Sequence, residues 1–212
     1  MITISAFGSA PDFAKGIVRD VRVRWALEEA GLPYQTRLLE QGDQDTAEYR
    51  ALQPFGQVPV FEEDGFVLFE SGAIVLEIAE RSGMLLPKDR KARARAVQWL
   101  IAALNSVEPS VVNVFLIDFV FTQEEWAKLR RPSAVELMNK KIDAVAKRLG
   151  DKPFLDGDSF TVGDLMMASV LRFHPDVRKR DPRLAAYIDR CTARPAFRRA
   201  FDAQLGDFRK AA

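Results

Sequence analysis

Two short motifs combine residue types that suit the binding of a small zwitterionic molecule. Val58-Pro59 opens one apolar segment, and Glu70-Ser71 precedes a predicted helix. Proline has no backbone N–H, so a Val-Pro pair at the start of a strand predicts a cis peptide bond and a backbone edge left open for a ligand. Glu70 and Ser71 would set a carboxylate beside unpaired N–H groups at a helix start. Together the motifs predict a site for a molecule that carries both an ammonium and a carboxylate.

The composition favours an ordinary globular protein. A net charge of +1 over 212 residues argues against nucleic acid or an acidic membrane as the main partner. With one cysteine and one histidine, the chain has no disulfide framework and no multi-histidine metal centre, and we expect no metal. We find no apolar run of membrane-span length and no signal peptide, so we predict a cytoplasmic protein without a membrane partner.

The first part of the chain alternates strand and helix patterns. Asp64-Gly65 between two apolar runs predicts a β-hairpin, because both turn residues adopt positive φ. The predicted elements are a strand at 2–6, a helix from about 14 to 30, a strand at 34–39, a helix at 46–52, strands at 58–61 and 66–69, and a helix from 71 to 83. This order predicts an α/β thioredoxin-like domain at residues 1–82.

After Pro87 the sequence carries helical patterns only, which predicts an all-α domain at residues 88–212. Thr161 with Asp164 three residues later predicts a capping box at the start of a core helix. Cys191 and His174 have structural interpretations, as a buried apolar residue and a helix-end residue.

Four segments in register resemble the bacterial glutathione transferase family. They are 23–34, with Arg24-Trp25-Ala26-Leu27-Glu28; 56–59, with Gly56-Gln57-Val58-Pro59; 70–74, with Glu70-Ser71-Gly72; and 160–165, with Phe160-Thr161-Val162-Gly163-Asp164. Residues 191–197 are similar to the family's last helices. The resemblance covers nearly the whole chain and implies a thioredoxin-like domain that binds glutathione. It also implies that the all-helical domain contributes the pocket for a second substrate.

The resemblance also implies residue roles. Val58, held by a cis Pro59, would pair its backbone with the cysteinyl part of glutathione. Glu70 would accept the γ-glutamyl ammonium, and Ser71 would donate its hydroxyl and N–H to the γ-glutamyl carboxylate. Glutathione would be the co-substrate of a small hydrophobic electrophile, in a homodimer with a role in detoxification.

The group that activates the thiol is not where the family usually has it. The positions that carry serine or tyrosine in relatives fall on Ile17 and near Phe13, and neither side chain donates a hydrogen bond. Ser9 after the first strand and Arg19 on the first helix are the alternatives, together with the helix N-terminus itself. Our hypothesis is that Arg19 and the backbone N–H groups replace the hydroxyl, with Phe13 as an apolar wall.

Three functions fit this sequence. The first is a transferase that adds the glutathione thiolate to small electrophiles. The second is glutathione-dependent reduction of peroxides, which needs only the activated thiolate and can accompany the first. The third is a non-catalytic glutathione-binding protein of the same fold, which the missing activator at Ile17 and Phe13 supports.

Overall fold

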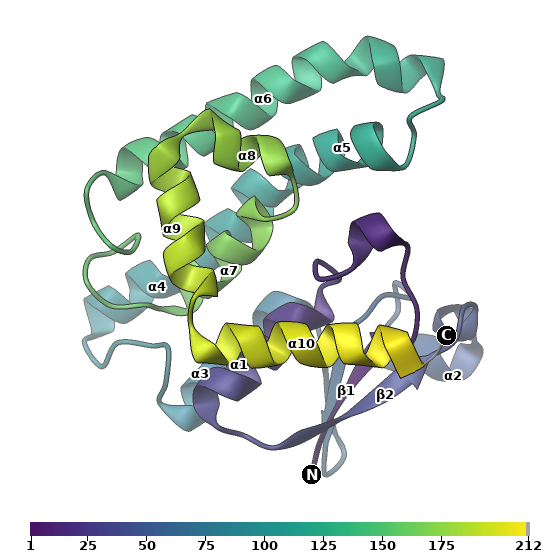
Figure 1. The fold of residues 1–212 in the computed structure, drawn as a ribbon. Helices are drawn as coiled ribbons and strands as arrows, with labels where there is room; N and C mark the ends of the chain where they lie inside the picture. The colour runs from purple at the N-terminus through teal and green to yellow at the C-terminus, as the bar shows by residue number, and fades with distance from the viewer. Residues whose placement is uncertain (211–212) are drawn as a thin grey trace. The chain divides into compact units, whose positions relative to one another are not determined.

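The computed structural model describes residues 1–210, and contacts within the chain divide them into two compact units. The first unit comprises residues 1–85 together with the segment that starts at Arg194, and the second comprises residues 86–193. Figure 1 shows the elements of both. The predicted site motifs all belong to the first unit.

A four-stranded mixed sheet forms the centre of the first unit. Its strands are β1 (Ile2–Phe7), β2 (Tyr34–Leu39), β3 (Val60–Glu63) and β4 (Phe66–Phe69), in the order β2-β1-β3-β4. β1 pairs in parallel with β2 because the helix α1 (Asp20–Ala30) connects them, whereas β3 is antiparallel to β1 and β4. The predicted thioredoxin-like arrangement is therefore confirmed.

The remaining elements of this unit are the helices between the strands. α2 (Ala47–Leu52) begins after Thr46, whose hydroxyl accepts the Tyr49 N–H, and α3 (Ser71–Ser82) ends at Gly83. A short 3₁₀ turn, η2 (Asp43–Asp45), precedes α2. The β3–β4 hairpin turns at Asp64 and Gly65 with φ values of 49° and 84°, as the Asp-Gly signal predicts.

The first helix is shorter than predicted. We expected a helix from about residue 14, but α1 spans Asp20–Ala30 and follows a 3₁₀ turn, η1 (Asp12–Ala14). Gly16 lies between the two with a φ of 82°, which interrupts a right-handed helix. A Cβ at this position would lie 2.3 Å from the Phe201 ring, so the loop depends on glycine for both its conformation and its packing.

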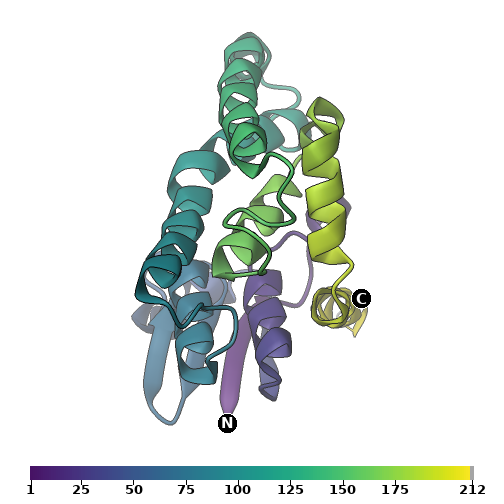
Figure 2. The same cartoon turned by 90° about the vertical axis from the view of Figure 1, so that its left-hand side faces the viewer.

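The last helix, α10 (Pro195–Lys210), packs within the first unit, although the sequence-based range placed it in the helical domain. It lies alongside α1 in both views (Figures 1 and 2). The Trp25 ring of α1 meets Phe197 edge to face at 4.8 Å, and Arg194 and Arg199 form ion pairs with Glu29 and Glu28. These contacts join residues about 170 positions apart in the chain, which local sequence patterns do not encode.

The second unit is built from helices. They are α4 (Arg90–Ala102), a π-helical turn η3 (Ala103–Val107), α5 (Glu108–Phe119), α6 (Glu125–Leu149), α7 (Val162–Leu171), α8 (Pro175–Arg180) and α9 (Pro182–Thr192). Every residue of α7 is buried. The predicted capping box is present at its start, with Gly163 N–H bonded to the Thr161 hydroxyl and Thr161 N–H bonded to Asp164.

The run from Arg90 to Phe119 differs from our expectation about apolar segments. It contains an 18-residue window with a mean hydropathy of 1.7, which is long and apolar enough to cross a membrane by length and composition alone. Half of that window is buried inside the protein. Core helices of globular proteins pass the same test, so this run is weak evidence for a membrane span.

Candidate functional site

The segment before β3 has the backbone conformation that the sequence predicts. The Val58–Pro59 peptide bond is cis, and Val58 and Pro59 are buried. The β3–β4 ladder begins only at Val60, so Val58 lies outside the paired part of the sheet. Gly56 has a φ of 63°, and a Cβ there would lie 2.8 Å from the Gln44 carbonyl oxygen. The segment is thus closely fitted to the loop before α2.

Glu70 and Ser71 form the junction between β4 and α3. Glu70 is exposed and has a φ of 70°, a backbone region that non-glycine residues rarely occupy and that concentrates at functional sites. Ser71 is the first residue of α3 and is buried. The first backbone N–H groups of a helix have no partner inside the helix, so this junction is suited to binding an anion.

Arg22 of α1 adds a positive charge at this junction. Its side chain is 1% exposed, and its Nη1 donates to the Ser71 Oγ across 3.3 Å. A guanidinium beside a helix N-terminus strengthens anion binding through charge and hydrogen bonds. Arg22 was not among the site residues that we predicted from the sequence. Arg22 lies two positions from both Asp20 and Arg24, so its side chain is on a different face of the helix from this i,i+4 pair. This spacing was the signal in the sequence that Arg22 has a different partner.

Ser9 lies at a pocket that adjoins Val58. The pocket has a volume of about 590 Å³. Its lining residues lie at the ends of β1 and β2 and in the segments that follow these strands, namely Phe7, Ser9, Ala10, Pro11, Ala14, Val18, Leu39, Gln41 and Gln44. Leu39 also forms a buried cluster with Val58, against which Phe7 and Val18 pack. The apolar wall of the pocket is therefore continuous with the packing around Val58, and Ser9 is exposed beside it.

Phe13 and Arg19, the other residues predicted near the thiol, are not among those that line this pocket. Phe13 belongs to the 3₁₀ turn η1 and is 41% exposed. Arg19 occupies the position just before α1 and is half-buried, so it stands at the helix N-terminus rather than within the helix as expected. The shorter α1 accounts for both placements.

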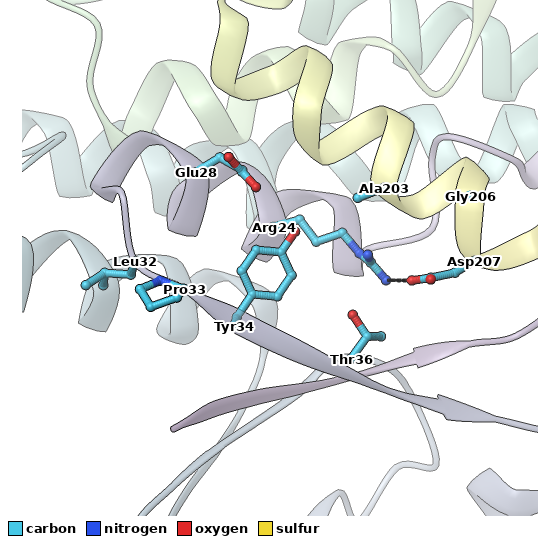
Figure 3. A pocket seen from close by; sticks show the side chains of 9 residues that line it. All are labelled: Arg24, Glu28, Leu32, Pro33, Tyr34, Thr36, Ala203, Gly206 and Asp207. Carbon is cyan, nitrogen blue, oxygen red and sulfur yellow. Dashed lines mark hydrogen bonds and ion pairs between the residues drawn. The ribbon is translucent and has the colours of Figure 1, made fainter.

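A second pocket, of about 460 Å³, surrounds Arg24 (Figure 3). The Arg24 guanidinium bonds Asp207 of α10 through Nη2 and Asp20 through Nε, both at 2.8 Å. Gln204 donates to the other oxygen of Asp20 at 2.6 Å. Burial raises the pKa of Asp20 to about 6 against the attraction of Arg24. These bonds fasten α1 to α10, so we assign Arg24 to structure rather than chemistry.

Among the described residues, no group of three His, Cys, Asp or Glu side chains is placed to hold a metal ion. Cys191 is buried in α9. His174 caps α8, where its Nδ1 accepts the Asp176 N–H, and its Nε2 lies 3.2 Å from Asp118.

Comparison with known proteins gives a consistent result along the chain. Residues 21–81 match the model of the glutathione S-transferase N-terminal domain, and residues 91–190 match the C-terminal domain. The chain is similar to glutathione S-transferase F10 of Arabidopsis thaliana, at 31% identity over 66% of this chain and 68% of the relative. It is also similar to the disulfide-bond oxidoreductase YfcG of Escherichia coli, at 28% identity over 86% and 90% of the two chains.

A solved structure shares the same architecture. The theta class glutathione S-transferase of Xanthomonas axonopodis pv. citri, with glutathione bound, superposes with a TM-score of 0.77 at 26% identity, over 94% of this chain and 96% of that one. The fold, the site motifs and these matches define the class of protein. The chain belongs to the glutathione S-transferase family, and it is an enzyme of that class.

Proposed function

We propose that this enzyme binds glutathione at the junction of β3, β4 and α3 and transfers its thiolate to small hydrophobic electrophiles. The observation that carries the proposal is the buried contact between Arg22 and Ser71 at the start of α3, next to Glu70 in its positive-φ conformation. A cation, a hydroxyl and unpaired N–H groups there suit a carboxylate. The exposed Glu70 carboxylate suits the neighbouring ammonium. These are the two charged groups of a γ-glutamyl moiety.

The thiol would then lie toward the pocket that Ser9 lines. In this proposal the Val58 backbone pairs with the cysteinyl residue, and the wall formed by Phe7, Val18 and Leu39 leads from Val58 to Ser9. The Ser9 hydroxyl would donate to the thiolate sulfur, and Arg19 is the second candidate, as a cation at the start of α1. Each unit by which the thiol pKa falls requires about 1.4 kcal/mol of preferential thiolate stabilisation.

The conjugation step needs only these groups. The thiolate sulfur attacks an electrophilic carbon, the carbon–sulfur bond forms, and the leaving group departs with the electron pair of its former bond. The thiol proton passes to solvent when glutathione ionises. Stabilising the thiolate raises the fraction of bound glutathione that can react at neutral pH.

Reduction of peroxides or disulfides is a second candidate function, favoured by the similarity to a relative named as a disulfide-bond oxidoreductase. Two glutathione molecules would supply the electrons, giving glutathione disulfide with an alcohol and water from a hydroperoxide, or with two thiols from a disulfide. Cys191 is buried in α9 of the second unit, so the reacting sulfur would be that of glutathione. Both reactions use the same activated thiolate.

The test is a titration of the thiolate absorbance of bound glutathione against pH, combined with calorimetric binding. We expect the bound thiol pKa to lie below that of free glutathione. Ser71→Ala should weaken binding by about tenfold, because a hydrogen bond to a charged group is lost. Ser9→Ala and Arg19→Ala should separate the two activators, since only the true one returns the pKa toward its free value.

Two results would contradict this proposal. Wild-type protein that does not bind glutathione would remove its basis. Protein that binds glutathione and leaves the thiol pKa unshifted would favour the non-catalytic binding function instead.

A further inference from the structure

A chain of hydrogen bonds joins the two ends of the segment that contains Val58 and Pro59. The Tyr49 hydroxyl of α2 donates to the Gln57 carbonyl oxygen at 2.7 Å. The Ser5 Oγ of β1 lies 2.8 Å from the Tyr49 oxygen and accepts the Val60 N–H at 2.7 Å. Gln57 and Val60 directly flank Val58 and Pro59, so the two side chains hold the segment from both sides.

The number of protons on each group fixes which group donates in each of these hydrogen bonds. Tyr49 has a single hydroxyl proton, which is used on Gln57, so the Ser5 hydroxyl donates to the Tyr49 oxygen. Burial raises the pKa of Tyr49, which keeps the phenol protonated and able to donate. The bonds therefore run from Val60 N–H through Ser5 and Tyr49 to the Gln57 carbonyl. Consecutive hydrogen bonds of one direction polarise and strengthen one another.

The Ser5 side chain continues the pairing of β1 with β3 beyond the last backbone-paired residues. The register between β1 and β3 pairs Thr3 with Glu62 and Ile4 with Phe61. The next residues in register are Ser5 and Val60, which are joined through the serine side chain instead. Ser5 is fully buried, and the Tyr49 ring packs in the same cluster as Val58 and Val60. The position of the Val58 backbone thus depends on two side chains from other elements.

We infer that Ser5 and Tyr49 are positioning residues that set the Val58 backbone for pairing with the cysteinyl part of glutathione. This inference rests on the proposed function, because the ligand is the same. Neither residue touches the ligand in this proposal. Loss of either hydroxyl would leave the Gln57 carbonyl or the Val60 N–H without its partner and release one end of the segment.

Tyr49→Phe is the first test, because it removes the hydroxyl and keeps the ring. We expect the dissociation constant of glutathione, measured by calorimetry, to rise about fivefold, the equivalent of one ordinary hydrogen bond. With 1-chloro-2,4-dinitrobenzene as electrophile, the KM for glutathione should rise by a similar factor while kcat stays within about twofold. Ser5→Ala tests the other end of the segment and serves if Tyr49→Phe does not fold.

A matched control and a double variant distinguish positioning from general stability. Tyr187→Phe removes another buried tyrosine hydroxyl, one bonded to Asp164 in the second unit, and should lower the unfolding midpoint without changing glutathione affinity. Ser5→Ala combined with Tyr49→Phe should weaken glutathione binding by less than the sum of the single effects, because both substitutions interrupt the same series of hydrogen bonds.

The outcomes also separate this inference from the proposed function. Wild-type protein that does not bind glutathione would overturn both. Wild-type protein that binds glutathione, with unchanged affinity in Tyr49→Phe and Ser5→Ala, would overturn the positioning role alone. An equal loss of affinity in Tyr187→Phe would do the same, because the effect would then follow from stability.

Discussion

At the scale of single residues, the charges at the start of α1 have different environments and different tasks. Asp20, Arg22 and Arg24 are each only about 1% exposed. Arg22 is directed to Ser71 at the candidate site, whereas Arg24 joins Asp20 to Asp207 of α10. Buried charges are costly unless they are paired, so each one here has a specific partner. Arg22 is two residues from each of the other two, which places it on a different helix face, whereas Asp20 and Arg24 are four residues apart and share a face.

Asp20 makes stability depend on pH in the opposite direction to a surface ion pair. Its folded pKa of about 6 lies above the ordinary value of 3.8, so the folded state binds the proton more tightly. The resulting stabilisation is present at low pH and is lost as the pH rises from about 4 to about 6. We predict that the free energy of unfolding of wild type, relative to that of Asp20→Asn, falls across this range by at most about 3 kcal/mol, because Asn does not titrate.

Urea unfolding of both proteins at several pH values checks this prediction. Asp143→Asn is the control, because Arg180 lowers the pKa of that exposed carboxyl and reverses the sign. The free energy of unfolding of wild type should therefore increase relative to that of Asp143→Asn as the pH rises. A stability difference between wild type and Asp20→Asn that stays constant from pH 4 to pH 7 would contradict the assignment.

At the scale of elements, the sequence predicted those features that depend on local signals. The Asp64-Gly65 hairpin, the end of α3 at Gly83 and the Thr161 capping box each follow from a few adjacent residues, and each is present. The start of α1 was predicted too early, because its apolar spacing extends back through Ile17 and the constraint on Gly16 comes from Phe201. The Arg22–Ser71 contact also joins distant segments, so adjacent residues did not predict it.

The capping box of α7 gives a prediction about an element. Thr161→Ala removes the hydroxyl that accepts the Gly163 N–H and donates to Asp164, and the site is buried. We expect the free energy of unfolding to fall by about 1–2 kcal/mol, at the upper end of cap effects because water does not replace the lost bonds. Chemical denaturation measures this, and Thr161→Ser, which keeps the hydroxyl, should recover most of the loss. Equal losses in both variants would assign the effect to the methyl group instead.

At the scale of the whole molecule, the chain leaves the first unit at residue 85 and returns to it at Arg194. Its return allows α10 to cover α1 through the Trp25–Phe197 contact and the Arg24–Asp207 ion pair. The two matched family domains end at residues 81 and 190, so α10 lies outside both. α10 is amphipathic, but the element that its apolar face contacts is fixed only by tertiary packing. The sequence-based domain range therefore assigned α10 to the helical domain.

Self-association is the last property at this scale, and we predict a homodimer. Phe66 and Val67 of β4 are exposed by 48% and 38%, and Phe55 in the segment before β3 is exposed by 62%. Large exposed apolar side chains that gather on one surface mark interaction sites. Phe55 also meets Phe69 edge to face at 6.1 Å, so it is held in place on this surface. Light scattering after gel filtration should give about twice the chain mass of 23.9 kDa. Phe55→Ser should shift the mass toward one chain, whereas Leu129→Ser, which removes a more exposed apolar side chain from α6, should not. A wild-type mass of one chain would contradict the dimer, and a shift only in Leu129→Ser would move its interface to the second unit.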